Sequence, residues 1–217
     1  MESIFSVSTL LKNIWCYLTK KFTIEVSHAS TAQLSTIGLE LKIMSNGWER
    51  FGPRIVIDGQ KPRLELAMQC GATHTIDMND YDTPEARIER VLELTGGIGA
   101  DKVIEVVGFP AVVEEGLKMV RMRGTYLEVG HISPNSFASI DVQKMVSNQI
   151  RFYGIQHYDP WIIPNAIDFL ERTADRYPLM NVISHEFPLD QIDKAFETAE
   201  WLGRSSGSEV TRAVITP

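Results

Sequence analysis

The sequence predicts an α/β fold that is built on a doubly wound parallel sheet. The first observation is residues 54–77, where an apolar, β-branched run, Ile55-Val56-Ile57, is followed by a turn, a helical pattern and a second apolar run. A short β-branched run is typical of a strand that is buried on both faces. The second observation is that strand and helix patterns keep alternating up to about residue 178. Such alternation is typical of a parallel sheet with helices on both faces.

Each predicted element carries a local signal. Pro62 suits the first turn of a helix, and Gly71 suits the position just after one. Thr83 and Asp141 have side-chain oxygens that are typical of helix N-caps, and Arg123-Gly124 predicts a turn. Strands are predicted at residues 22–26, 55–57, 73–76, 102–107, 125–129, 150–155, 181–187 and 213–215. Helices are predicted at residues 36–45, 62–70, 84–95, 110–120, 142–147, around 167–170 and at 190–201.

Composition narrows the class of protein. A formal charge of −7 without a basic cluster argues against a nucleic-acid partner. Two cysteines are too few for a disulfide framework, which favours a reduced, cytoplasmic compartment. Apolar side chains recur at helical spacing over residues 4–18, a stretch too short to span a bilayer. We therefore expect an amphipathic helix that packs on its own domain, with membrane-surface binding as the alternative.

Asp58 is the strongest candidate site residue. It ends the first buried strand of the βαβ unit, where a dinucleotide-binding domain holds the ribose hydroxyls of its ligand. From its position alone it would be only a turn residue. The nearby Lys61 and Arg63 could offset the charge of Asp58, but they are equally well explained as solvated residues of the following helix.

Four phrases occur in a fixed order: IVIDGQKPRLELAMQCGATHTID, LTGGIGADKVIEVVG, VEEGLKMVRMRGTYLEVG and ISHEFPLDQIDKAFETAE. Together they resemble the C-terminal part of medium-chain, zinc-type alcohol dehydrogenases. The resemblance implies a Rossmann-like domain with an incomplete first βα unit and a missing N-terminal catalytic domain. We accordingly expect a divergent segment at residues 1–30, a nucleotide-binding domain at 31–178, and a tail at 179–217 that returns towards the missing domain.

Two departures from the family pattern bear on function. Aligning Gly38 with the end of the family's G-x-G-x-x-G motif leaves Gln33 and Ser35 at the first two glycine positions. A Cβ at those positions obstructs the approach of the backbone to a pyrophosphate. The cysteine and histidine ligands of the family's catalytic zinc also have no counterparts. We therefore expect weak or lost NAD binding, no metal ligands and no catalytic residues in this chain.

The resemblance implies a cofactor site formed by Gly38, Asp58, Gly108, Gly130 and Arg212. The negative charge of Asp58 favours NAD over NADP, because it would repel a 2′-phosphate. Gly108 and Gly130 end two predicted strands, and turn geometry alone would also explain them. Arg212, in the tail, is equally well explained as a solvated residue.

The remaining candidates are histidines and a cysteine. His131 follows Gly130 at the same predicted edge, and the sequence offers no matched acidic partner for it. His157 and His185 are predicted to be structural. Cys70 is predicted on a surface helix, without a partner at metal-ligand spacing.

Several functions stay open at this point. The first is an alcohol dehydrogenase-type oxidoreductase that is truncated and inactive alone. The others are a non-catalytic interaction or regulatory domain, a gene fragment without independent function and, more remotely, a methyltransferase, which would also need a glycine-rich first loop. The resemblance further implies a homodimer through the strand at residues 151–155.

Overall fold

The computed structural model describes residues 23–26, 53–131, 134–156, 162–175, 177–199 and 211–217. Within them, six parallel strands form one sheet in the order β3-β2-β1-β4-β5-β6. The prediction of a doubly wound parallel sheet is therefore confirmed. The strands are β1 (Thr23–Val26), β2 (Arg54–Asp58), β3 (His74–Asp77), β4 (Ala100–Glu105), β5 (Val120–Glu128) and β6 (Arg151–Gly154).

From β1 the chain adds β2 and β3 on one side of the sheet and then adds β4, β5 and β6 on the other side. The order of the strands therefore reverses between β1 and β4. β1 pairs with β2 on one side and with β4 on the other, so that Val26 lies opposite both Ile57 and Glu105. In doubly wound sheets, ligands bind outside the carboxyl ends of the strands at such a switch point. The residues that end β2, β4 and β5 therefore lie at the edge where a ligand would bind.

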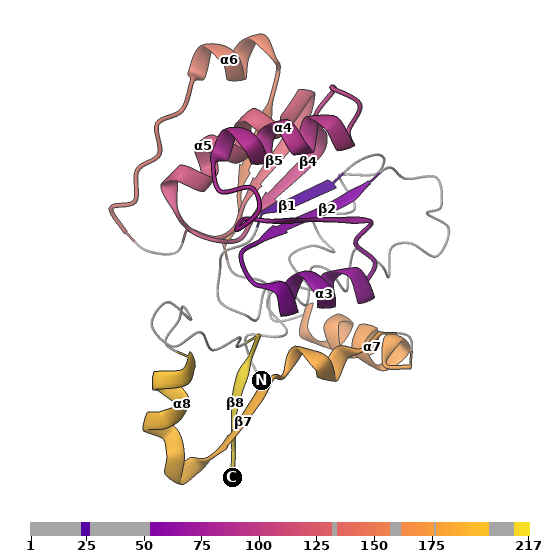
Figure 1. Cartoon of the computed structure of the whole chain (residues 1–217), viewed down its shortest axis with the longest axis vertical. Coiled ribbons are helices and arrows are strands. Elements are labelled where there is room, and N and C mark those ends of the chain that lie inside the picture. Colours follow the sequence, from indigo (N-terminus) through magenta and orange to yellow (C-terminus); the bar gives the residue numbers. More distant parts are fainter. Residues whose placement is uncertain (1–22, 27–52, 132–133, 157–161, 176, 200–210) are drawn as a thin grey trace.

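Helices cover both faces of the sheet (Figure 1). α4 and α5 lie on one face, while α3 and α7 lie on the other. Alternate residues of a strand point to opposite faces. Accordingly, Ile55 and Ile57 join the α4 and α5 side of the core, and Val56 packs with Leu64 and Ala67 of α3. The helices are α3 (Lys61–Gln69), α4 (Pro84–Leu94), α5 (Pro110–Met119), α6 (Val142–Ser147) and α7 (Ile163–Thr173).

Three of the predicted helix-end signals are confirmed. The Thr83 hydroxyl accepts a hydrogen bond from the Ala86 amide, and the Asp141 carboxylate accepts one from the Lys144 amide at 2.9 Å. Gly71 follows α3 with φ of 105°, a conformation that favours glycine. The helices predicted at residues 4–18 and 36–45 lie outside the described residues.

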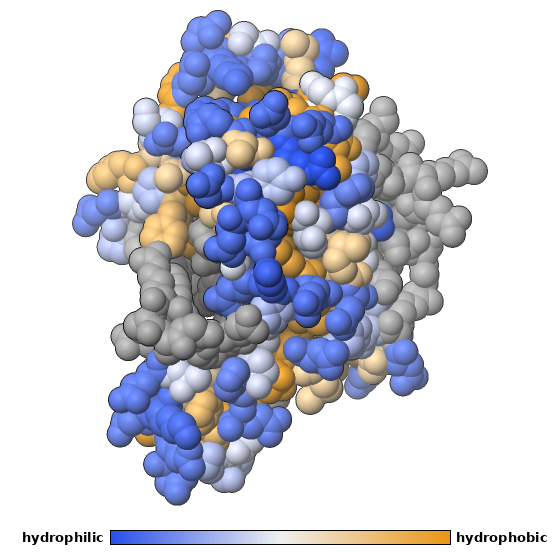
Figure 2. All heavy atoms as spheres, viewed as in Figure 1, coloured by the Kyte–Doolittle hydropathy of each residue, from blue (hydrophilic) through white to orange (hydrophobic). Residues whose placement is uncertain are grey.

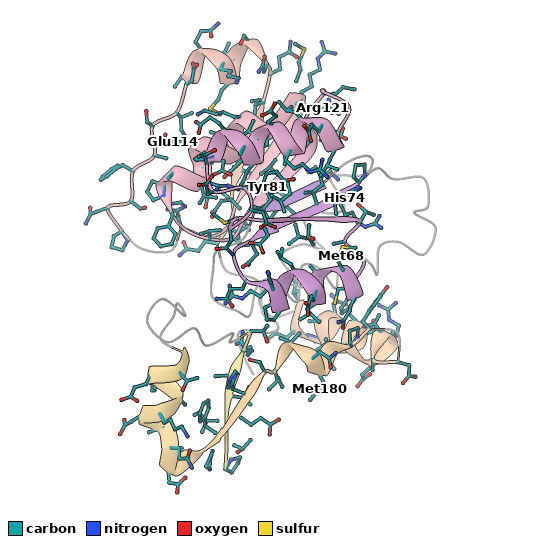
Figure 3. All side chains as sticks on the ribbon, in the orientation of Figure 1. Met68, His74, Tyr81, Glu114, Arg121 and Met180 are labelled. Atoms are coloured by element: carbon teal, nitrogen blue, oxygen red, sulfur yellow. The ribbon has the colours of Figure 1, made fainter. Side chains whose placement is uncertain are left out.

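The turn predicted at Arg123-Gly124 is wrong, because both residues belong to β5. Between the pairs Ala100↔Val120 and Lys102↔Thr125, β5 has more residues than β4, so the strand bulges. Arg123 takes φ of 59° in this bulge. Arg121, which is labelled in Figure 3, pairs with Asp101 at the amino end of β4. The bulge therefore lies at the opposite end of the strands from the candidate site.

The last part of the chain forms a separate small unit below the main sheet in Figure 1. β7 (His185–Pro188) and β8 (Ala213–Thr216) pair in parallel, and α8 (Ile192–Ala199) contacts both strands. The strand predicted at residues 181–187 begins too early, because Leu179–Val182 is a 3-10 helix. The helix predicted at 190–201 begins with a 3-10 turn, Leu189–Gln191, before α8. The glycine- and serine-rich loop that precedes β8 lies outside the described residues.

Hydrophilic residues make up most of the face shown in Figure 2.

Two polar contacts fix α5 to its neighbours. α4 and α5 are joined by a buried ion pair, in which the Arg87 guanidinium donates to both carboxylate oxygens of Glu115 at 2.7 Å. On the same side, the Glu114 carboxylate accepts a hydrogen bond from the Ser139 amide and ties the segment before α6 to α5 (Figure 3). Among the described residues, no helix is long and apolar enough to cross a lipid bilayer.

Candidate functional site

Three acidic residues lie at the carboxyl edge of the main sheet. Asp58 ends β2, Glu105 ends β4 and Glu128 ends β5. Asp58 and Glu105 are fully buried, and the side chain of Glu128 is only 13% exposed. Ionised carboxylates are rarely buried unless they are paired or hydrogen-bonded.

The Asp58 side chain is held by the start of α3, the helix that follows β2. Its Oδ1 accepts a hydrogen bond from the Gln60 amide at 2.8 Å, and its Oδ2 lies 3.7 Å from Nη1 of Arg63. Arg63 is only 11% exposed, so its interpretation as a solvated residue is wrong. Lys61, at the start of α3, is exposed as expected. The charge that would repel a 2′-phosphate is therefore partly balanced by a neighbouring guanidinium.

Glu105 and Glu128 lie side by side because their strands pair in register, residue against residue. Oε1 of Glu105 accepts hydrogen bonds from the amides of Val107 and Gly108, at 2.6 and 2.8 Å. Burial, and then the adjacent Glu128 carboxyl, raise the pKa of Glu105 to about 8. Near neutral pH Glu105 therefore holds a proton.

His131 completes this group. Its Nδ1 lies 2.9 Å from Oε1 of Glu128 and 3.7 Å from Oε2 of Glu105. Its backbone amide also donates to Oε1 of Glu128 at 3.2 Å. His131 thus has two acidic neighbours, and the expectation that it lacks an acidic partner is wrong. We refer to Glu105, Glu128 and His131 as the carboxylate–histidine cluster.

Gly108 and Gly130 pack against each other beside the cluster. A Cβ on Gly130 would lie 2.3 Å from the Gly108 nitrogen and 2.6 Å from Oε2 of Glu105. Gly108 has φ of 82°, and a Cβ there would lie 2.5 Å from the Gly130 oxygen. Both positions therefore require glycine, because backbone or a buried carboxyl occupies the space of a side chain.

Tyr126 precedes Glu128 by two residues on β5, so both side chains lie on the same face of the strand. Its ring stacks on that of Phe152 at a centroid distance of 5.2 Å, and it is fully buried. Burial raises the pKa of the Tyr126 hydroxyl well above its usual range, and the nearby glutamates add to the effect. This phenol therefore stays protonated and is not a candidate base.

The structure places no other predicted site residue at this edge. Gly38 is outside the described residues, as is His157. Arg212 precedes β8 in the two-stranded sheet, where its carbonyl accepts hydrogen bonds from the Ser184 amide and hydroxyl. His185 stacks on Phe187 in the same sheet. Cys70 is fully buried between α3 and α7, so its placement on the surface is wrong.

Sequence reasoning missed Glu105 and Glu128 as site residues. The two glutamates occur in similar strand endings, IEVVG and LEVG. In each, the glutamate lies between apolar residues and a glycine follows shortly after. This repeated strand ending was the available signal. What the sequence does not give is the register that brings the two glutamates side by side.

The strand order and the acidic end of β2 define the doubly wound class to which the nucleotide-binding domains of dehydrogenases belong. A family model described as zinc-binding dehydrogenase matches residues 54–172, more than half of the 217 residues. The chain therefore belongs to the zinc-binding dehydrogenase family, and the resemblance inferred from the sequence is confirmed.

Among curated relatives, erythritol/L-threitol dehydrogenase of Mycolicibacterium smegmatis is 29% identical over 75% of this chain and 41% of its own length. L-threonine 3-dehydrogenase of Bacillus subtilis is 34% identical over 66% of this chain and 40% of its own. A solved alcohol dehydrogenase from Thermotoga maritima has a TM-score of 0.77 at 23% identity, over 97% of this chain and 54% of that one. The chain thus spans about half the length, or less, of these proteins.

Proposed function

We propose that this chain is the nucleotide-binding part of an alcohol dehydrogenase-type oxidoreductase, and that the 217 residues alone bind NAD weakly and do not oxidise alcohols. The observation that carries the proposal is the position of Asp58 at the carboxyl end of β2, beside the switch between β1 and β4. The names of the relatives, which are alcohol and polyol dehydrogenases, support the same reaction class. In that reaction a hydride passes between an alcohol and a nicotinamide ring.

Part of the site fits NAD. Asp58 offers a carboxylate at the strand end where ribose hydroxyls are held, and the turns at Gly108 and Gly130 follow the carboxyl ends of β4 and β5, at the same edge of the sheet. The sequence after β1 fits less well. The first glycine after Val26 is Gly38, twelve residues later, whereas the phosphate-binding glycines of such folds directly follow the first strand.

The catalytic zinc of the family is not supported by the described residues. Zinc, where it is bound in such enzymes, polarises the alcohol oxygen. The one group of three metal-ligating side chains in the described residues contains no cysteine, and Cys70 is buried elsewhere. We therefore assign no step of alcohol oxidation to this chain and propose that it contributes cofactor binding alone.

The proposed organisation follows the same division. Residues 31–178 are the nucleotide-binding domain, and residues 179–217, with β7, α8 and β8, are the tail that joins the catalytic domain of a complete family member. Apolar side chains of this tail that are 41–69% exposed fit such a contact: Leu189, Ile192 and Phe196. Residues 1–30 are proposed to be a divergent segment.

We also propose a homodimer through β6. All four residues of β6 are exposed, and β6 is an edge strand of the six-stranded sheet. An exposed edge strand presents unpaired backbone groups, and a second copy can pair with them across a two-fold axis. The aromatic side chains Phe152 and Tyr153 would supply apolar contact area there.

A non-catalytic regulatory domain is the second candidate. One observation favours it: the Gln60 amide and Arg63 already contact the Asp58 carboxylate. A ribose would have to compete with these partners. The two candidates differ in whether NAD binding depends on Asp58.

An activity assay tests the proposal directly. Purified protein is incubated with Zn²⁺, NAD and a panel of simple alcohols and polyols, and NADH is followed by its absorbance. We expect no turnover above the protein-free control. Zinc-dependent NADH formation would overturn the proposed lack of activity.

A further inference from the structure

The carboxylate–histidine cluster contains an arrangement that ordinarily destabilises a sheet. Glu105 and Glu128 are directly paired across β4 and β5, and like charges in such positions repel each other. Both are nearly or fully buried, so water screens the repulsion little. The imidazole of His131 lies beside both carboxyl groups. The repulsion is relieved either by a proton on Glu105 or by a cation bound between the two carboxyl groups.

The inner oxygens of both carboxyl groups are available to a ligand. Oε2 of Glu105 and Oε2 of Glu128 are buried and, within the part of the chain that the structure describes, accept no hydrogen bond. Oε1 of Glu105 is fixed by the Val107 and Gly108 amides, which orients the other oxygen towards His131. Unsatisfied buried oxygens are costly, so two of them in one cluster of side chains indicate a missing partner.

The spacing of the three side chains suits a metal ion. One ligand atom from each of Glu105, Glu128 and His131 lies within 4.8 Å of the others. Tetrahedral zinc ligands at about 2.0–2.2 Å from the ion stand roughly 3.3–3.6 Å apart. The 3.7 Å between Nδ1 of His131 and Oε2 of Glu105 is close to that value.

We propose that Glu105, Glu128 and His131 bind a divalent transition-metal ion of the Zn²⁺ type. One imidazole nitrogen and two carboxylate oxygens suit Zn²⁺ and Co²⁺, whereas Mg²⁺ and Ca²⁺ prefer oxygen ligands alone. The site is distinct from a cysteine-ligated zinc, because its three ligands include no thiolate. Three protein ligands leave one position open to water or to a ligand group.

The metal would fix the loops that follow two central strands. Glu105 precedes the Gly108 turn, and Glu128 and His131 flank Gly130. Because Gly108 and Gly130 already pack together, an ion between the glutamates would tie the ends of β4 and β5 into one unit. Its expected effect is structural, with the open position facing the edge of the sheet where ligands bind.

Zinc binding by the full chain tests the proposal. The protein is stripped with EDTA, desalted and titrated with Zn²⁺ by calorimetry, for the wild type and for Glu105→Gln, Glu128→Gln and His131→Asn. We expect one equivalent to bind to the wild type and each substitution to weaken the affinity at least tenfold, since loss of even outer-shell partners costs about 10–100-fold. The partly exposed His131 provides a variant whose folding is easily preserved, which circular dichroism verifies.

His74→Asn and His185→Asn are the matched controls, because both histidines lie outside the cluster, and we expect them to leave affinity unchanged. Co²⁺ should give visible d–d bands without the intense near-ultraviolet absorption of thiolate ligation. Absence of zinc binding, which would mean that a proton alone joins the glutamates, overturns the proposal. Equal affinity in the wild type and the three cluster variants, or a thiolate band, overturns it as well.

Discussion

Glu105 and Glu128 face each other from paired positions at the carboxyl ends of β4 and β5, with Nδ1 of His131 lying 2.9 Å from one and 3.7 Å from the other. Burial, and then the adjacent Glu128 carboxyl, raise the pKa of Glu105, so near neutral pH this side chain holds a proton when no metal is bound. The stability of the metal-free protein should therefore depend on the protonation of Glu105.

The first prediction concerns pH. The pKa of Glu105 rises from 4.5 to about 8 in the folded protein, so between these values the folded state binds a proton that the unfolded state has lost. Stability from this group is complete below about pH 4.5 and decreases as pH rises towards 8. Glu105→Gln imitates the protonated form, and we expect it to flatten the melting temperature against pH over this interval.

The measurement is a series of thermal melts in EDTA, which removes any metal. Exposed Glu89, on α4, provides the control Glu89→Gln, for which we expect the wild-type slope. If wild type and Glu105→Gln gave parallel curves between pH 5 and 8, the raised pKa of Glu105 would be wrong.

The second prediction concerns the ion pair that joins α4 to α5. Arg87→Met leaves the buried Glu115 without its two guanidinium bonds, and such a loss costs about 3–5 kcal/mol of unfolding free energy. Urea denaturation measures it. Arg90→Met, which breaks the exposed pair with Glu93 on the same helix, should change stability little. Equal small effects of both substitutions would contradict a structural role for the buried pair.

The fold was largely predictable because its signals are local. Ile55-Val56-Ile57, Gly71 and the Thr83 cap each act within a few residues, and each stands where the sequence places it. The bulge at Arg123 was not predictable, because an arginine followed by glycine is typical of a turn and only pairing with β4 extends the strand through it. The same applies to residues 181–182, where the apolar pattern of a strand occurs in a 3-10 helix.

The site was predictable only in part, for a related reason. Asp58 is recognisable because its position at the end of a βαβ strand is a local pattern. The pairing of Glu105 with Glu128 depends on the register between strands 23 positions apart, which no local pattern sets. The contact between Arg63 and Asp58 likewise depends on how far α3 is rotated, and so a partly buried ion pair was interpreted as solvated.

The third prediction concerns assembly. If β6 is the dimer edge, Tyr153→Lys places like charges close together across the two-fold axis and should give a monomer. Light scattering reports the mass, with Ile98→Lys, in the exposed turn after α4, as the control that stays dimeric. A wild type that remains monomeric at high concentration would refute the proposed edge.

The fourth prediction concerns the N-terminal residues. The apolar stripe of residues 4–18 needs a partner, and we expect it to cover part of the tail or of the nucleotide-binding domain. Deleting residues 1–20 should then lower the melting temperature. An unchanged value would show that these residues contribute nothing to folding.

The measurement that tests the central claim most directly is calorimetric titration of the full chain with NAD. Loss of two charge-assisted hydrogen bonds at the pyrophosphate costs roughly 3 kcal/mol, which takes a micromolar site to a dissociation constant of roughly 0.1 mM or weaker. We expect binding in that weak range and a further loss in Asp58→Ala, but none in Asp168→Ala on the exposed side of α7. Micromolar binding that vanishes in Asp58→Ala would contradict the account, because it would show that the lack of glycine at positions 33 and 35 does not weaken binding.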